Sequence, residues 1–319
     1  LIRRVLPLVP MNPELFTRAR GALLGLVAGV QIGRRTAHLR TPEAIKALFP
    51  HGVRDLTPAP PADESGGHAV EDDGAAMALR LGESVVACGT FEVADVARRW
   101  VQWMQADNGR VSTTTRRALE RIAAGTEPFE AGRLARGGPS STGTGSVLRT
   151  IPIALRFHDS VDRLMRVSAQ QAAITHADER CLWGAAAVSV AVRELLQGNG
   201  FFVDEVLHHL RDLAPRVLAD AIHRAPREEQ GELLIGVDGQ GGDVVRSVEV
   251  AFWFATRGPA LEEALVFLAE AGGDTEANAG LAGALLGARD GEAGIPPRWL
   301  DQLSDAARIR ELADALVAG

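Results

Sequence analysis

The chain has 319 residues, which is long enough to bury a large core as one large domain or two ordinary ones. Hydrophobic residues make up 46% of it and charged residues 24%, a balance that excludes an intrinsically disordered chain. The formal net charge of -7 argues against non-specific binding to nucleic acid or to an anionic membrane.

The chain opens with the sequence LIRRVLPLVP, ahead of Met11. This stretch is too short and too interrupted by proline to span a membrane, and no clean cleavage site follows it. We therefore expect residues 1–13 to be an N-terminal extension, with translation beginning at Met11. Cys88 and Cys181 are too few for a disulfide framework and lie in apolar sequence, so we expect buried thiols in a cytoplasmic protein.

Predicted helices follow one another closely from residue 14 onward. The first, residues 14–33, is rich in glycine and almost wholly apolar in its second half, which predicts a buried helix that approaches another helix closely. Residues 50–70 are expected to form a proline-rich loop, and residues 131–146, rich in Gly, Ser and Thr, a structured loop. Further helices are expected at residues 74–87, 93–104, 113–124 (with a threonine N-cap), 147–156, 161–174, 179–197, 202–213, 214–224, 243–257, 260–271, 277–289 and 301–317. Because linkers, repeats and strand-favouring runs are scarce, residues 14–319 are predicted to be one compact all-α domain.

Two acidic clusters begin predicted helices that are about 200 residues apart in the chain. The first is Glu71-Asp72-Asp73-Gly74, and the second is Gly272-Gly273-Asp274-Thr275-Glu276. Acids at a helix start are stabilised by the helix, and either cluster alone is explained in that way. Together, the two helix starts could also bring carboxylates to one hard cation that prefers oxygen ligands.

A glycine-rich segment, Thr142-Gly143-Thr144-Gly145-Ser146, precedes another predicted helix. Glycines here allow backbone N–H groups to approach a ligand, although any tight turn into a helix has a similar composition. Arg149, just beyond it, either binds a phosphate or makes a structural ion pair, and we favour the structural role. His176 is interpreted as a histidine with satisfied hydrogen bonds.

Six segments carry a resemblance to a known family: GALLGLVAGVQIG, EDDGAAMALRLGESVV, TTTRRALERI, STGTGSVLRTIPIAL, ITHADERCLWGAAAVSVAV and GGDTEANAGLAGALLGARDGEAGIPPRWL. Each is similar to a motif of the ADP-ribosylglycohydrolase family; the last resembles that family's GGDTDTNAAIAGALLG segment. The matches occur in the family's order and cover about residues 14–303.

The resemblance implies a compact, single-domain orthogonal helical bundle of the ADP-ribosylglycohydrolase type. It also implies hydrolysis of an N- or O-glycosidic bond at the anomeric carbon of ADP-ribose, with one or two Mg²⁺ or Mn²⁺ ions as cofactor. ADP-ribose or an ADP-ribosylated substrate is therefore the expected partner, and the oligomeric state stays open. The residues implied are Asp73 and Asp274 for catalysis, Thr142, Gly143, Thr144, Gly145 and Ser146 for substrate binding, and Glu71, Asp72, Asp73, Asp274 and Glu276 for the metal.

This chain departs from the family at several metal-ligand positions. Glu71 and Gly74 replace the threonines that flank the family's first Asp pair. Glu276 replaces an Asp in the second cluster, and Ala277 replaces a Thr. The loop at residues 34–38, where some members carry an acid, offers none. Three hypotheses follow: a metal-dependent ADP-ribosyl hydrolase, an impaired member that binds ADP-ribose or a related nucleotide without efficient hydrolysis, and a structural protein. The first two predict that Asp72, Asp73 and Asp274 converge.

Overall fold

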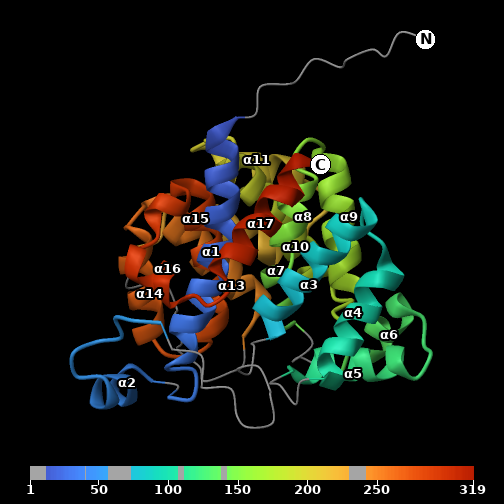
Figure 1. The fold of residues 1–319 in the computed structure, drawn as a ribbon, viewed down its shortest axis with the longest axis horizontal. Coiled ribbons are helices and arrows are strands. Elements are labelled where there is room, and N and C mark those ends of the chain that lie inside the picture. Colours follow the sequence, from blue (N-terminus) through green and yellow to red (C-terminus); the bar gives the residue numbers. More distant parts are fainter. Residues whose placement is uncertain (1–11, 40, 57–72, 107–110, 138–141, 230–241) are drawn as a thin grey trace.

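The computed structural model describes residues 12–39, 41–56, 73–106, 111–137, 142–229 and 242–319, and within these ranges it contains helices and no strand (Figure 1). In chain order the helices are α1 (Pro13–Arg34), α2 (Pro42–Leu48), α3 (Asp73–Cys88), α4 (Val93–Ala106), α5 (Thr113–Ala123), α6 (Pro128–Ala135), α7 (Gly145–Leu148), α8 (Ile151–Arg156), α9 (Val161–Ala173), α10 (Glu179–Leu196), α11 (Phe202–His209), α12 (Arg216–Arg224), α13 (Val244–Arg257), α14 (Leu261–Glu270), α15 (Thr275–Asp290), the 3-10 helix η2 (Glu292–Gly294), α16 (Pro297–Gln302) and α17 (Ala306–Ala318). The predicted all-α fold is confirmed.

The centre of the fold is the antiparallel pair of α1 and α15, whose backbones touch. Four glycines of α1, spaced four residues apart, face α15: Gly21, Gly25, Gly29 and Gly33. A Cβ added at any of them would lie only 2.1–2.2 Å from a backbone oxygen of α15. Residues four apart share one helix face, so this spacing makes a continuous contact surface. The close approach predicted from the glycines of residues 14–33 is confirmed.

The apolar character of α1 is explained by its burial. Among the described residues, α1 is the one helix long and apolar enough to cross a bilayer, and 67% of its most apolar window is buried inside the protein. Its neighbours include α14, α15 and α17, which cover it on several sides (Figure 1). Such burial is the pattern of a core helix in a helical domain.

Several boundaries differ from those predicted. Residues 147–156 form two short helices, α7 and α8, rather than one. Helix α6 occupies the start of the predicted 131–146 loop, because Pro128 takes the first helical turn and the Glu127 carboxylate accepts a hydrogen bond from the Glu130 N–H. Helices α2 and α16, each beginning at a proline, were not predicted.

Two local predictions were wrong. The N-cap residue of α5 is Ser112 rather than a threonine, and its hydroxyl donates to Thr115 Oγ1 instead of capping the helix. Cys181 is buried as expected, but Cys88, the last residue of α3, is exposed. A C-terminal helix position can face solvent even in apolar sequence, since the helix ends there.

Candidate functional site

The carboxylate of Asp274 is directed at the glycine-rich loop rather than at its own helix. Asp274 is the N-cap residue of α15, yet its side chain makes no capping hydrogen bond. Instead, Thr144 Oγ1 donates to Asp274 Oδ2 over 3.3 Å. Gly242 packs against the same oxygen so tightly that a Cβ at position 242 would lie 1.8 Å from it. The structure therefore joins a predicted metal and catalytic residue to a predicted substrate-binding residue.

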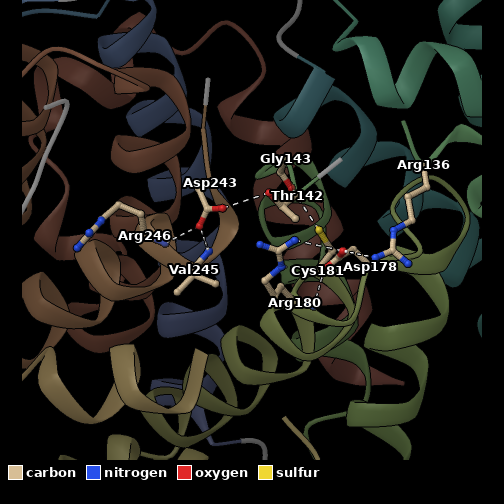
Figure 2. A network of polar contacts seen from close by, with 9 residues as sticks. All are labelled: Arg136, Thr142, Gly143, Asp178, Arg180, Cys181, Asp243, Val245 and Arg246. Carbon is tan, nitrogen blue, oxygen red and sulfur yellow. Dashed lines mark hydrogen bonds and ion pairs between the residues drawn. The ribbon is translucent and has the colours of Figure 1, made fainter. Parts of the chain in front are cut away.

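The loop from Thr142 to Ser146 is held by the start of α13 (Figure 2). Thr142 Oγ1 donates to Asp243 Oδ2 over 3.1 Å, and the Val244 N–H donates to the Thr142 carbonyl over 2.9 Å. Asp243 also caps α13 by accepting from the N–H groups of Val245 and Arg246. One carboxylate thus fixes both the helix start and the loop.

Buried polar side chains support the loop from beneath. Arg149 is 1% exposed; its guanidinium donates to Gln171 and Thr175 and lies over the Trp100 ring. Burial lowers the pKa of Arg149 to about 10, and the charge of Asp73 acts in the opposite direction. These partners agree with the structural role that the sequence favoured.

His176 lies under the loop glycines. Its Nδ1 is 2.7 Å from Thr175 Oγ1, and a Cβ at Gly143 would be 3.2 Å from its Nε2. Burial, and then the charge of Arg149, lowers the pKa of His176 to about 3, so the ring is neutral at pH 7. The added Cβ at Gly145 would also face this buried layer, in ordinary contact with His176 and Arg149. Of these two glycines, it is Gly143 whose missing Cβ lets the loop rest on the buried layer.

Asp73 begins α3 and is partly buried. Its Oδ2 accepts a 2.9 Å hydrogen bond from the Ser112 N–H, just before α5. Loss of hydration raises the pKa of Asp73 above its usual value, although the Ser112 bonds and the charge of Arg149 lower it. A carboxylate that is poorly hydrated at a helix start has a high affinity for a cation or a proton.

Helix α7 packs against two helices that begin at acidic residues. It contacts both α3, which Asp73 begins, and α15, which Asp274 precedes. Glu71 and Asp72 lie outside the described residues, so the expected convergence of Asp72, Asp73 and Asp274 stays a prediction. Within the described ranges, no three His, Cys, Asp or Glu side chains are grouped in a way that could hold a metal ion.

Glu276 points to a different neighbour from Asp274. Its Oε1 is 3.9 Å from Nε of Arg34, the last residue of α1. The backbones meet here as well, because Thr275 Oγ1 donates to the Gly33 carbonyl over 2.6 Å. The two acids of the second cluster are therefore two residues apart in sequence but have different partners.

Sequence reasoning missed Asp243, Gly242 and Asp178. Asp243 had a usable signal, because an Asp just before an apolar periodic segment is a common N-cap. Asp178 caps α10 through the Arg180 N–H and pairs with Arg136 and Arg180 (Figure 2). Gly242 had no such signal, since its importance comes only from the proximity of Asp274.

Comparison with known proteins identifies the fold and its motifs. Residues 11–319 match the sequence model of the family described as ADP-ribosylglycohydrolase. The chain belongs to the ADP-ribosylglycohydrolase family.

Named relatives agree with this assignment. The chain is 28% identical to an ADP-ribosyl-[dinitrogen reductase] glycohydrolase of Rhodospirillum rubrum, over 96% of this chain and 98% of that protein. It is 29% identical to an ADP-ribosylarginine hydrolase of Pseudomonas putida, over 96% of this chain and 80% of that protein. A solved structure titled "ADP-ribosylglycohydrolase-related protein complex" matches with a TM-score of 0.75 and 27% identity, covering 96% of this chain and 99% of that one.

The donor chemistry of this ADP-ribosylglycohydrolase site fits a hard divalent cation. Asp274 offers a carboxylate that does not cap its helix, and Asp73 offers one that is short of water. Both groups are oxygen donors, which suit Mg²⁺ or Mn²⁺ better than soft metals. The Cys181 thiol lies 3.8 Å from the Gly143 carbonyl oxygen, and burial raises its pKa to about 12.

Proposed function

We propose that this chain is a metal-dependent ADP-ribosyl hydrolase, which cleaves a glycosidic bond at the anomeric carbon of ADP-ribose on a modified protein or small molecule. The observation that carries the proposal is the contact between Thr144 of the glycine-rich loop and the Asp274 carboxylate. This contact supports the proposal because it joins the segment predicted to bind substrate to an acid predicted to bind a cation. The names of the two bacterial relatives, which act on ADP-ribosyl groups, support the substrate class.

The residues have separate tasks in this proposal. The loop from Thr142 to Ser146 binds the ADP-ribose moiety through backbone N–H groups, as glycine-rich turns at helix starts bind phosphates. Asp73 and Asp274, with Glu71 and Asp72 as further candidates, would hold Mg²⁺ or Mn²⁺. When bound by these carboxylates, such an ion would supply charge stabilisation and an activated water.

The protein's own side chains position the Asp274 carboxylate and the loop. Thr144 orients the Asp274 carboxylate by donating to its Oδ2, at the point where the loop meets the start of α15. The buried layer of Arg149 and His176 keeps the loop in place. Because His176 is neutral at pH 7, it adds no charge beneath the substrate. The layer therefore contributes shape and fixed dipoles, and the acids contribute the charge.

A second candidate is an impaired member that binds ADP-ribose or a related nucleotide without efficient hydrolysis. Two observations favour it: the family's hydroxyl ligands are absent at Gly74 and Ala277, and Glu276 lies beside an arginine. Lost transition-state interactions lower turnover more than ground-state binding. Binding and hydrolysis must therefore be measured separately.

The test uses ADP-ribosylarginine and ADP-ribosylserine peptides, with Mn²⁺ or Mg²⁺, and detects released ADP-ribose by chromatography. Calorimetry measures ADP-ribose binding in the same buffers. Asp274→Asn should reduce release at least about tenfold, while Asp301→Asn, an exposed acid on α16, should not change it. Binding with no release supports the impaired member. If the chain neither binds ADP-ribose at millimolar concentration nor releases it from any peptide, both proposed functions are refuted.

A further inference from the structure

Arg34 occupies an unusual place for a cation, beside an acid of the candidate site. It is the last residue of α1, and Glu276 lies in the first turn of α15. Their side chains are 22% and 18% exposed, with 3.9 Å between Nε and Oε1. Solvent and salt screen the attraction in a partly buried ion pair less than they screen it in a pair on the surface.

The backbone holds this pair together. A Cβ at Gly33 would lie 2.2 Å from the Thr275 carbonyl oxygen and 2.8 Å from Glu276 Cα, so the two helices touch at this point. The Thr275 hydroxyl also donates to the Gly33 carbonyl. Both helix ends suit the charges that they carry, since a cation stabilises a helix C-terminus and an anion a helix N-terminus. The helix contact therefore keeps the backbones of Arg34 and Glu276 next to each other, and their side chains meet as an ion pair without a hydrogen bond at Glu276 Oε1.

Asp274 and Glu276 are thereby separated in function. The Asp274 carboxylate faces Thr144 and Gly242, whereas the Glu276 carboxylate faces α1. We propose that Arg34 acts as a built-in cation for Glu276, so that this chain binds one divalent ion, on the Asp274 side, and no second ion at Glu276. The inference rests on the proposed metal dependence and specifies which acid takes part in it.

The physical reason is electrostatic. The guanidinium is always charged, and it cancels one of the two negative charges that Asp274 and Glu276 would offer to cations. A divalent ion at Glu276 would meet a fixed positive charge a few ångströms away, in a place shielded from solvent. Removing that charge should free Glu276 as a ligand.

The neighbouring Arg35 provides a matched control. Its guanidinium donates to the Asp55 carbonyl over 2.7 Å and lies over the Phe49 ring, away from Glu276. Arg35→Met thus removes a charge and shortens a side chain in the same turn, without changing the partner of Glu276. Arg34→Met makes the same chemical change at the proposed position.

The experiment is titration of the metal-free full chain with Mn²⁺, reading free Mn²⁺ by electron paramagnetic resonance. Wild type should bind one Mn²⁺ per chain. Glu276→Gln should still bind one Mn²⁺ per chain, with an affinity within about twofold of wild type. Asp274→Asn should weaken Mn²⁺ binding at least about tenfold. Arg34→Met should add a second ion or tighten binding about tenfold, Arg35→Met should not, and Glu276→Gln in the Arg34→Met background should remove the gain.

Three results would overturn the inference: two Mn²⁺ ions per wild-type chain, a large loss of affinity in Glu276→Gln, or an unchanged titration in folded Arg34→Met. If Arg34→Met does not fold, the comparison of Glu276→Gln with Asp274→Asn still decides. ADP-ribose binding and release, measured on the same samples, report separately on the proposed function. A chain that hydrolyses substrate while binding two ions would keep the function and lose the inference.

Discussion

The contact between α1 and α15 allows one prediction to be worked out in detail. In Gly25→Ala, the new methyl carbon would lie 2.1 Å from the Gly283 carbonyl oxygen and 2.8 Å from its carbon. Ordinary contact begins near 3.4 Å, so the two backbones must separate by about 1.3 Å. The neighbouring glycines, Gly21 and Gly29, make equally close contacts, so the separation cannot be confined to one residue.

Two opposing effects set the magnitude. Overpacking in a core costs typically about 1–3 kcal/mol and sometimes more, and a gap of even 0.5–1 Å forfeits roughly a quarter to a half of the dispersion attraction. Alanine gains about 1 kcal/mol over glycine in helix propensity. Because the whole helix pair must open, we expect a net loss of about 2–3 kcal/mol in the free energy of unfolding. That loss corresponds to a fall of roughly 5 °C in melting temperature for a chain of this size.

The assay is urea and thermal unfolding followed by circular dichroism, with Gly200→Ala as the control. A Cβ at Gly200 would have no atom within 4 Å, so this substitution should be neutral or slightly stabilising. If Gly25→Ala unfolds within 0.5 kcal/mol of Gly200→Ala, the claim that the glycines permit an obligatory backbone contact is refuted.

Three further predictions concern the site. Asp73→Asn should raise the melting temperature in EDTA at pH 7, because burial raises the pKa of Asp73 and the ionised form loses stability as the pH rises through that value; a lower melting temperature would contradict this. The wild type should lose about 2 kcal/mol in its free energy of unfolding between pH 6.5 and pH 5, because the folded state holds the His176 pKa at about 3 while the unfolded chain takes up its proton near pH 6.5. His176→Gln should remove this loss in urea unfolding, and an unchanged pH dependence would contradict the prediction. Gly242→Ala should weaken Mn²⁺ binding at least about tenfold with little loss of helicity, because its Cβ would displace the Asp274 carboxylate; unaltered Mn²⁺ titration would show that this carboxylate does not bind the ion.

Much of the fold could be read from local pattern. The apolar, glycine-rich stretch at residues 14–33 predicted both burial and close helix contact, because both follow from the absence of a Cβ on one helix face. Short helices were less predictable. Helix α6 has only eight residues, and its start depends on the Glu127 cap and Pro128 rather than on apolar periodicity.

The candidate site was predictable as residues but not as contacts. The motif pattern selected Asp274 and the loop at Thr142–Ser146, and the structure joins them through Thr144. It gave no reason to expect Gly242 beside Asp274, because residues 242 and 274 come together only through the packing of α13 against α15. Likewise, the sequence marked Arg34 only as part of the segment at residues 34–38 that lacks an acid. Its proximity to Glu276 depends on how α1 ends against α15.

The same backbone contact serves stability and site geometry. The α1 face that meets α15 at Gly21, Gly25 and Gly29 continues to Gly33, one residue before Arg34. At that end, α15 begins with Thr275, directly after Asp274. Any change that separates the helices at Gly33 must therefore move Asp274 relative to Thr144 and also Glu276 relative to Arg34. Because a packed helix pair resists small displacements, the site inherits its precision from the most tightly packed part of the core.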